Sequence, residues 1–151
     1  MIKKLLFLFT LLISTLISCA NNQSEEPIKD SELKNIISNF FKKYENSPEA
    51  AIDYICSTNK TFTPEQTSDL KNKLLAIQSK IGKFQEIEQI TSKQTSKSLI
   101  LYSYLVKHEI QPLRVTFIFY KPNKQWILYK FKFDDDFDKE LEESGRIYFI
   151  K

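Results

Sequence analysis

The sequence predicts an α+β fold in which three N-terminal helices pack on a strongly curved antiparallel sheet of about four strands. Two observations predict it. Apolar residues recur at helical spacing up to Gly82, and beyond that glycine they alternate with polar residues at a period of two. Because the helical patterns all precede the strand patterns, helices and strands are segregated along the chain, which is typical of α+β domains.

The first helix is predicted from a cap at Asp30 or Ser31, since both side chains can accept a hydrogen bond from a free backbone N–H of the first turn. Its apolar residues are spaced as one buried stripe on a helix. They are Leu33, Ile36, Ile37, Phe40 and Tyr44.

Two further helices are predicted to start at Ser47-Pro48 and at Thr63-Pro64, where proline suits the first helical position. Gln66 stands three residues after Thr63 and predicts a capping box. The third helix carries Leu70, Leu74, Ile77 and Ile81 on its apolar side. Gly82 then predicts a left-handed C-terminal cap.

Four segments after Gly82 have strand character. Residues 84–91 alternate with Gln and Glu and predict an edge or solvent-facing strand. Residues 99–108, 113–120 and 126–133 are rich in β-branched and aromatic residues and are separated by polar or proline-containing turns. These three segments are stronger strand candidates than residues 84–91.

The turn at Pro122 predicts the register of the last hairpin. A three-residue loop over 122–124 pairs Tyr120 with Trp126 and Phe119 with Ile127. One face of the hairpin then carries Val115, Phe117, Phe119, Ile127, Tyr129 and Phe131. The more mixed face carries Thr116, Ile118, Tyr120, Trp126, Leu128 and Lys130. A slip of one residue would mix the two sets.

The N-terminus has the parts of an export signal. Lys3 and Lys4 precede a mainly apolar stretch, residues 5–17, which is shorter than the roughly 20 residues that a membrane-spanning helix needs. The following Leu16-Ile17-Ser18-Cys19 resembles the lipobox of bacterial lipoproteins. This resemblance implies that residues 1–18 are removed and that Cys19 carries the lipid that binds the membrane.

Three segments follow from this assignment: the leader 1–18, a lipidated Cys19 with a polar, flexible tether over 19–29, and a single folded domain over 30–151. The resemblance also implies a place in the bacterial cell envelope, outside the cytoplasm. This is the outer membrane in a bacterium with two membranes, and otherwise the outer face of the plasma membrane.

The charge balance argues against nucleic acid as a partner. The chain has 22 basic and 19 acidic residues, and removal of Lys3 and Lys4 leaves 20 against 19. Nucleic-acid-binding domains usually carry a clustered excess of Lys and Arg.

Cysteine usage agrees with the lipoprotein assignment, because Cys56 is then the one remaining thiol and has no partner for an internal disulfide.

The order of elements also resembles a known superfamily. Three helices, then Gly82-Lys83-Phe84 and a long meander that ends in residues 117–122 and 126–134, are similar to the NTF2-like or cystatin-like α+β roll. That resemblance implies a strongly bent sheet that wraps the long helix and leaves a cone-shaped pocket at one end. The residues predicted to line such a pocket are Tyr102, Tyr104, Phe117, Phe119, Tyr129 and Phe131.

An isomerase- or dehydratase-like member of this superfamily would need a buried carboxylate beside a phenol. Tyr102, Tyr104 and Tyr129 are the candidate phenols. Asp53, Glu86 and Glu109 are the candidate carboxylates. No catalytic motif connects them, so no catalytic residue is assigned.

Three remaining features favour structural roles. His108 is predicted at the surface near a strand end, and Cys56 as a buried thiol on the second helix. The acidic run 134–138 lacks the Gly and Glu of an EF-hand loop and is predicted to begin a short helix. No metal or cofactor is expected. Residues 146–150 predict a final short strand or an apolar tail.

Three functions stay open at this point. The first is a non-enzymatic binding module that uses an aromatic-lined pocket or sheet face for a small apolar ligand or a protein. The second is an accessory or immunity-type lipoprotein, for which a filled core and an exposed apolar patch are expected. The third is an enzyme of isomerase or dehydratase type, for which a buried carboxylate with a shifted pKa is expected.

Overall fold

The computed structural model of the chain describes residues 31–138 and 141–142. The predicted leader, the tether, Cys19 and the segment 146–150 lie outside these residues. Three helices precede four strands along the chain. Their bounds are α1 Ser31–Asn46, α2 Pro48–Ser57, α3 Pro64–Ile81, β1 Phe84–Ser96, β2 Leu99–His108, β3 Leu113–Tyr120 and β4 Ile127–Asp134.

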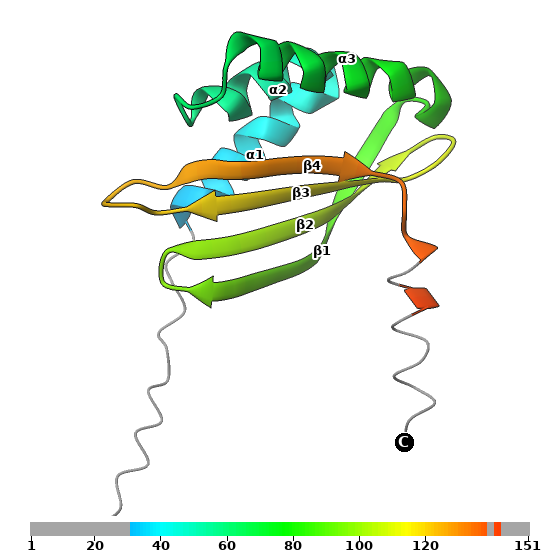
Figure 1. Cartoon of the computed structure of the whole chain (residues 1–151). Helices are drawn as coiled ribbons and strands as arrows, with labels where there is room; N and C mark the ends of the chain where they lie inside the picture. Colours follow the sequence, from blue (N-terminus) through cyan, green and yellow to red (C-terminus); the bar gives the residue numbers. More distant parts are fainter. Residues whose placement is uncertain (1–30, 139–140, 143–151) are drawn as a thin grey trace, which may run out of the picture.

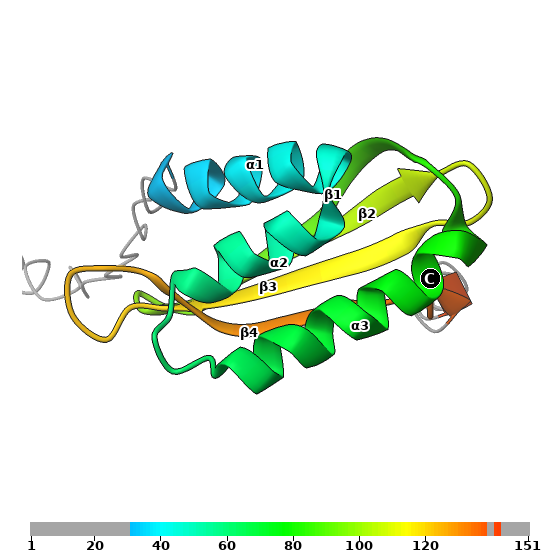
Figure 2. The ribbon, with the colours of Figure 1, turned by 90° about the horizontal axis from the view of Figure 1, so that it is seen from above.

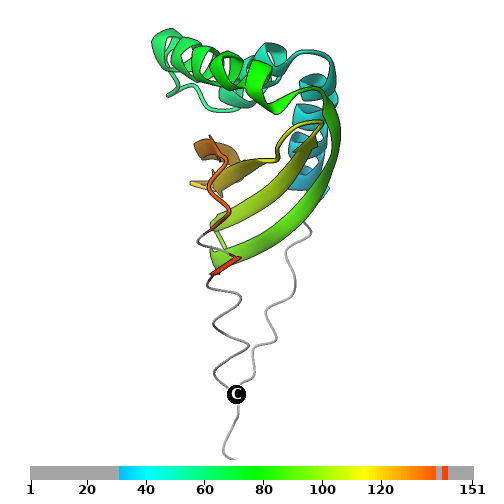
Figure 3. The ribbon, with the colours of Figure 1, turned by 90° about the vertical axis from the view of Figure 1, so that its right-hand side faces the viewer.

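The strands form one antiparallel sheet in the order β1-β2-β3-β4, and the three helices lie over one of its faces (Figures 1 and 2). The long strand β1 curves strongly along its length (Figure 3), and the described part of the sheet is not closed. The prediction of an α+β fold with three helices before four antiparallel strands is therefore confirmed. The predicted edge strand is β1, which continues beyond residue 91 to Ser96.

Helix α1 supplies the largest part of the helical core. Its predicted stripe is buried except for the half-buried Ile36, and Phe41 is buried as well. Phe40 contacts Phe117 with 5.1 Å between ring centroids, and Phe41 contacts Tyr104 at 5.2 Å. Edge-to-face pairs at such distances add stability beyond that of burial alone. These contacts hold α1 against the centre of the sheet.

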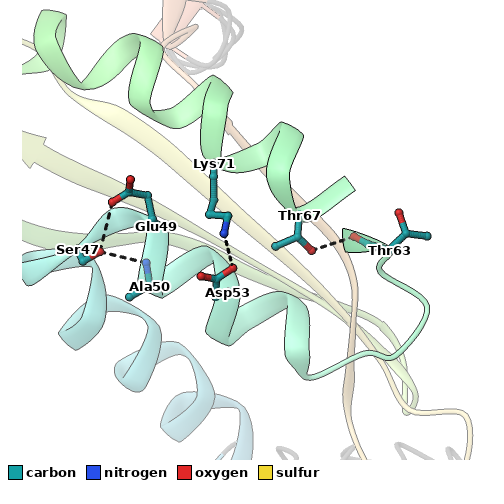
Figure 4. A network of polar contacts seen from close by, with 7 residues as sticks. All are labelled: Ser47, Glu49, Ala50, Asp53, Thr63, Thr67 and Lys71. Carbon is teal, nitrogen blue, oxygen red and sulfur yellow. Dashed lines mark hydrogen bonds and ion pairs between the residues drawn. The ribbon is translucent and has the colours of Figure 1, made fainter. Parts of the chain in front are cut away.

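Local capping explains where α2 and α3 begin, and Figure 4 shows the cap of α2. The Ser47 side chain accepts a hydrogen bond from the Ala50 N–H at 3.2 Å. Thr63 and Gln66 form the predicted capping box, in which each side chain accepts from the backbone N–H of the other at 3.3 and 3.0 Å. Both helices have proline in the first turn, where no N–H is needed.

Two polar contacts fix the second and third helices to their neighbours. Lys71 Nζ on α3 lies 2.8 Å from Asp53 Oδ1 on α2 (Figure 4). The buried Asn59, in the α2–α3 loop, donates from Nδ2 to the Leu128 carbonyl of β4 at 2.8 Å. This loop is therefore joined directly to the sheet.

Gly82 ends α3 with a positive φ of 82°, as predicted, but with a ψ of −167°. The cap is thus not the predicted left-handed helical one. It lies in a backbone region that is essentially open only to glycine. The extended ψ directs the chain away from the helix and into β1.

The predicted register of the β3–β4 hairpin is wrong by one residue at the loop. Tyr120 pairs with Ile127 and Phe119 with Leu128, so the loop spans residues 121–126. The physical reason for this difference is the burial of Trp126, which is only 6% exposed and therefore belongs to the core. Lys121 Nζ lies over its ring. The longer loop accommodates this large side chain.

A β-bulge at Tyr129 restores the inward face of β4. Phe119 pairs with Leu128 and Ile118 with Lys130, so Tyr129 is an extra residue without a partner on β3. Leu128 and Phe131 consequently both point into the core, although they are three residues apart. Tyr129 is 63% exposed, and its assignment to the inward face was wrong.

Candidate functional site

Most of the predicted pocket face is core. Five of its six residues are at most 8% exposed, and the exception is Tyr129. The five are Tyr102, Tyr104, Phe117, Phe119 and Phe131. The structure thus brings five of the predicted side chains together, and it separates the sixth from them.

Rings from α1 and from the sheet fill the space over this face. Phe117 is completely buried, and its ring centroid lies 5.1 Å from that of Phe40, 5.9 Å from that of Phe41 and 5.4 Å from that of Phe131. Phe119 is also completely buried. These rings are in contact with one another and leave no surface of Phe117 or Phe119 for a ligand.

Tyr104 alone of the five reaches an open groove between α1 and β1, which we call the α1–β1 groove. This groove has a volume of about 310 Å³. The Tyr104 hydroxyl donates to Gln89 Oε1 at 3.4 Å. The apolar lining residues are Ile37, Phe41, Phe84, Ile87 and Tyr104.

The polar side chains of the α1–β1 groove come from α1. Lys34, Lys42 and Glu45 are exposed at its rim, together with Ser38. An apolar floor with charges at its rim is the common pattern of a binding site, since burial of apolar surface supplies affinity and the rim charges supply orientation. The groove also lies along β1, one of the two edge strands of the described sheet.

A second hollow, of about 260 Å³, lies between α3 and β4. The exposed Tyr129 and the nearly buried Phe131 both line it, with Leu70 and Phe62 on the helical side. Two of the predicted pocket residues thus meet at this hollow.

The single histidine lies in a third hollow, of about 290 Å³, where the C-terminal ends of α1 and α3 meet the start of β1. His108 Nε2 is 3.2 Å from Tyr44 Oη. Burial raises the pKa of Tyr44 and lowers the pKa of His108. Both side chains are therefore uncharged at neutral pH, and the phenol can donate to the imidazole.

His108 is the last residue of β2, near a strand end as predicted, and it is half-buried rather than fully exposed. Its ring also lies 6.2 Å from that of Phe84 and 5.9 Å from that of Tyr44. The sequence offered one signal, the position of Tyr44 at the end of the apolar stripe of α1. It offered none for contact between residues 64 positions apart.

The three candidate carboxylates are all exposed. Asp53 pairs with Lys71, and Glu86 pairs with Lys107. Glu109 Oε2 accepts a hydrogen bond from the backbone N–H of Lys83 at 3.3 Å. An isomerase-type site needs a carboxylate inside an apolar pocket. None of the three has such surroundings.

Cys56 is buried at 3% exposure, as predicted, and burial raises the pKa of its thiol. A thiol held in the neutral form is a poor nucleophile. The fold thus uses Cys56 as a small apolar side chain of α2, which agrees with the prediction of a structural thiol.

Arg114 binds the carboxylate of Asp134, the last residue of β4. Arg114 donates from Nε to Asp134 Oδ1 at 3.0 Å, and its guanidinium lies 5.5 Å from the Phe137 ring centroid. The Leu141 N–H donates to the Phe137 carbonyl at 3.1 Å, which is the bond of one helical turn. Residues 31–138 and 141–142 contain no group of three potential metal ligands.

Comparison of the chain with protein-family models, with curated proteins and with solved structures finds no match. None of the helices in the described part of the chain is both long and apolar enough to span a membrane.

Proposed function

We propose that the chain is a bacterial lipoprotein, anchored outside the cytoplasm through acyl chains on Cys19, and that its domain is a non-enzymatic binding module. The lipobox-like Leu16-Ile17-Ser18-Cys19 supports the anchor. Three helices over one face of a curved four-stranded meander support a domain of the NTF2-like or cystatin-like roll type. Fold alone says little about function, so the binding site is argued from its residues.

The proposed binding site is the α1–β1 groove, and the observation that carries it is the composition of this groove. Side chains from α1, β1 and β2 form an apolar floor of about 310 Å³ that is open to solvent beside the edge strand. Lys34 and Lys42 provide positive charge at the rim, against the single Glu45. A site of this kind fits an extended segment of a partner protein with apolar side chains and an acidic residue.

The filled core favours a protein partner over a small ligand inside the roll. Phe117 and Phe119 are completely buried by other rings, so the interior offers them no ligand contact. An accessory or immunity-type role fits an open groove of this type. The isomerase or dehydratase alternative has less support, because Asp53, Glu86 and Glu109 are exposed.

The test is a photo-crosslinking amino acid at Ser38, inside the groove, in the full chain expressed in its native bacterium. A matched position is Asn72, which is exposed on α3 outside this groove. We expect one discrete protein adduct from position 38 and none from position 72. Lys42→Glu, which changes the rim without touching the core, should weaken the adduct.

Ile87→Glu and Ile90→Glu form a matched pair on β1. Ile87 lines the groove, whereas Ile90 is already 42% exposed. We expect only Ile87→Glu to abolish the adduct, with circular dichroism showing that both variants are folded. A membrane-anchored chain that gives no adduct at position 38 would contradict the proposed site. Retention of a small apolar molecule in native mass spectrometry would contradict the protein occupant.

A further inference from the structure

Four chain segments gather at one end of the domain. They are the first residue of α1, the α2–α3 loop, the β1–β2 turn and the β3–β4 loop (Figures 1 and 2). We call this the tether end and define it as Ser31 with residues 58–63, 97–98 and 121–126. The segment that precedes the domain joins it at Ser31, and therefore at this end.

The loops of the tether end contain only basic charges. Their charged residues are Lys60, Lys97, Lys121 and Lys124, without Asp or Glu. Lys121 is half-buried over the Trp126 ring, and the other three are exposed. Across residues 31–138 and 141–142, no carboxylate forms an ion pair with any of the four.

Acidic residues are fewer at this end and more frequent at the other. Among the residues that the structure describes, Glu32 and Glu65, in the first turns of α1 and α3, are the acidic residues next to the tether end, so the four loop lysines outnumber these two. The connections at the opposite end carry Lys83 with Glu109, Asp135, Asp136 and Asp138. Charge is therefore separated along the direction of the strands.

The length of the preceding segment keeps the tether end close to the proposed anchor. Ser31 is twelve positions after Cys19, and a chain of this length cannot span more than about 43 Å. A lipid on Cys19 thus brings the domain to the membrane, and the charges decide which end faces it. Anionic lipids attract exposed lysines near the surface.

We propose that the tether end binds anionic phospholipid headgroups and thereby orients the domain on the membrane. This proposal rests on the lipid anchor of the proposed function. A basic surface next to acyl chains is the usual second signal for stable membrane attachment. In this orientation the strands run away from the membrane, the acidic end is outermost, and the α1–β1 groove is accessible from the side.

The test uses the full lipidated chain in vesicles of phosphatidylcholine, with or without phosphatidylglycerol. A fluorophore on Asn123→Cys reports on the tether end, and one on Ile110→Cys, at a position 68% exposed, reports on the opposite end. The buried Cys56 is protected from labelling. We expect stronger energy transfer to a headgroup acceptor from position 123 than from position 110, with a difference that is larger in anionic than in neutral vesicles and that falls at high salt.

Charge reversal provides the matched variants. Lys60→Glu, Lys97→Glu and Lys124→Glu together should reduce the difference in anionic vesicles to the difference in neutral vesicles, with Lys121 retained because it covers Trp126. Lys43→Glu, Lys73→Glu and Lys80→Glu change net charge equally on the helices and should preserve the larger difference in anionic vesicles. Equal transfer from both positions in anionic vesicles, or a difference that is as large in neutral vesicles, would overturn the proposal.

Failure of the proposed lipid anchor can be distinguished from failure of the proposed headgroup site. A chain that carries no lipid and does not associate with neutral vesicles would refute the anchor. Co-sedimentation of that chain with phosphatidylglycerol vesicles then tests the headgroup site alone, with binding expected to fall by more than about fivefold for each lysine reversed. No co-sedimentation would overturn the site. Loss of the protein adduct in the Lys60, Lys97 and Lys124 variant, with orientation unchanged, would assign these lysines to the partner and also overturn it.

Discussion

Tyr44 Oη lies 3.2 Å from His108 Nε2, so the last turn of α1 contacts the last residue of β2. Burial raises the pKa of the phenol and lowers that of the imidazole. The hydrogen bond therefore joins two neutral side chains at neutral pH. It fixes the helix to the sheet at the end of the domain opposite to Ser31.

This contact predicts a pH dependence of stability. Below the usual His pKa of 6.5, the unfolded chain takes up a proton on His108 while the folded chain resists it, so the free energy of unfolding falls as pH falls. Above this value the contribution is fully present. Urea unfolding at a series of pH values measures it.

His108→Gln is expected to flatten the dependence between pH 6.5 and the lower folded pKa. Tyr44→Phe preserves the ring packing and should cost about 0.5–1.5 kcal/mol through the lost hydrogen bond. If His108→Gln leaves the pH dependence of the unfolding free energy unchanged, another group causes this dependence and our interpretation of the contact is wrong.

The bulge in β4 predicts opposite results for two neighbouring aromatic residues. Phe131 is 7% exposed and packs on Phe40 and Phe117, so Phe131→Ala should cost about 3–5 kcal/mol. Tyr129 is 63% exposed, so Tyr129→Ala should change the free energy of unfolding by less than about 0.5 kcal/mol. Chemical denaturation measures both. A larger loss of unfolding free energy for Tyr129→Ala would contradict the bulge and support a regular register in which Tyr129 faces the core.

The capping box predicts the cost of one hydroxyl. Thr63→Ala removes the acceptor for the Gln66 N–H and should lower the free energy of unfolding by about 1 kcal/mol. Thr61→Ala in the preceding loop is the matched control, because its backbone N–H, not its side chain, makes the contact with Asn59. Equal effects of the two substitutions in thermal unfolding would argue against the box.

Gly82 combines a positive φ with a close approach to the β2–β3 loop. A Cβ at this position would lie 3.0 Å from Glu109 Cβ and 3.1 Å from Ile110 Cγ1. Gly82→Ala should therefore destabilise the domain by more than about 1 kcal/mol. Adding Ile110→Ala to this variant removes part of the steric crowding but leaves the strain of a positive φ at Ala. We therefore expect only partial recovery of the melting temperature. Full recovery would mean that the backbone is not strained.

Local signals in the sequence predicted the elements well. The apolar spacing that ends at Tyr44 and the pair Thr63 and Gln66 act within a few residues, and the structure contains both. The predicted register of β4 was wrong because the register depends on the burial of Trp126, which an alternating pattern does not indicate. Long-range packing decided that position.

The site was less predictable than the fold. An alternating pattern of aromatic residues predicts an inward-facing side of a strand, whether that side lines a filled core or an open pocket. Phe117 belongs to the core because α1 places Phe40 and Phe41 over it. Tyr104 was predicted and does reach the α1–β1 groove. The rim lysines, Lys34 and Lys42, gave no signal, since their role depends on where α1 lies.

The lipid anchor on Cys19 underlies both the proposed location and the proposed orientation, and the mass of the N-terminal peptide from the membrane fraction tests it most directly. We expect this peptide to begin at Cys19 and to carry acyl chains, and we expect Cys19→Ala to yield no acylated peptide. A mature chain that begins elsewhere, or a Cys19 peptide without acyl mass, would contradict the account.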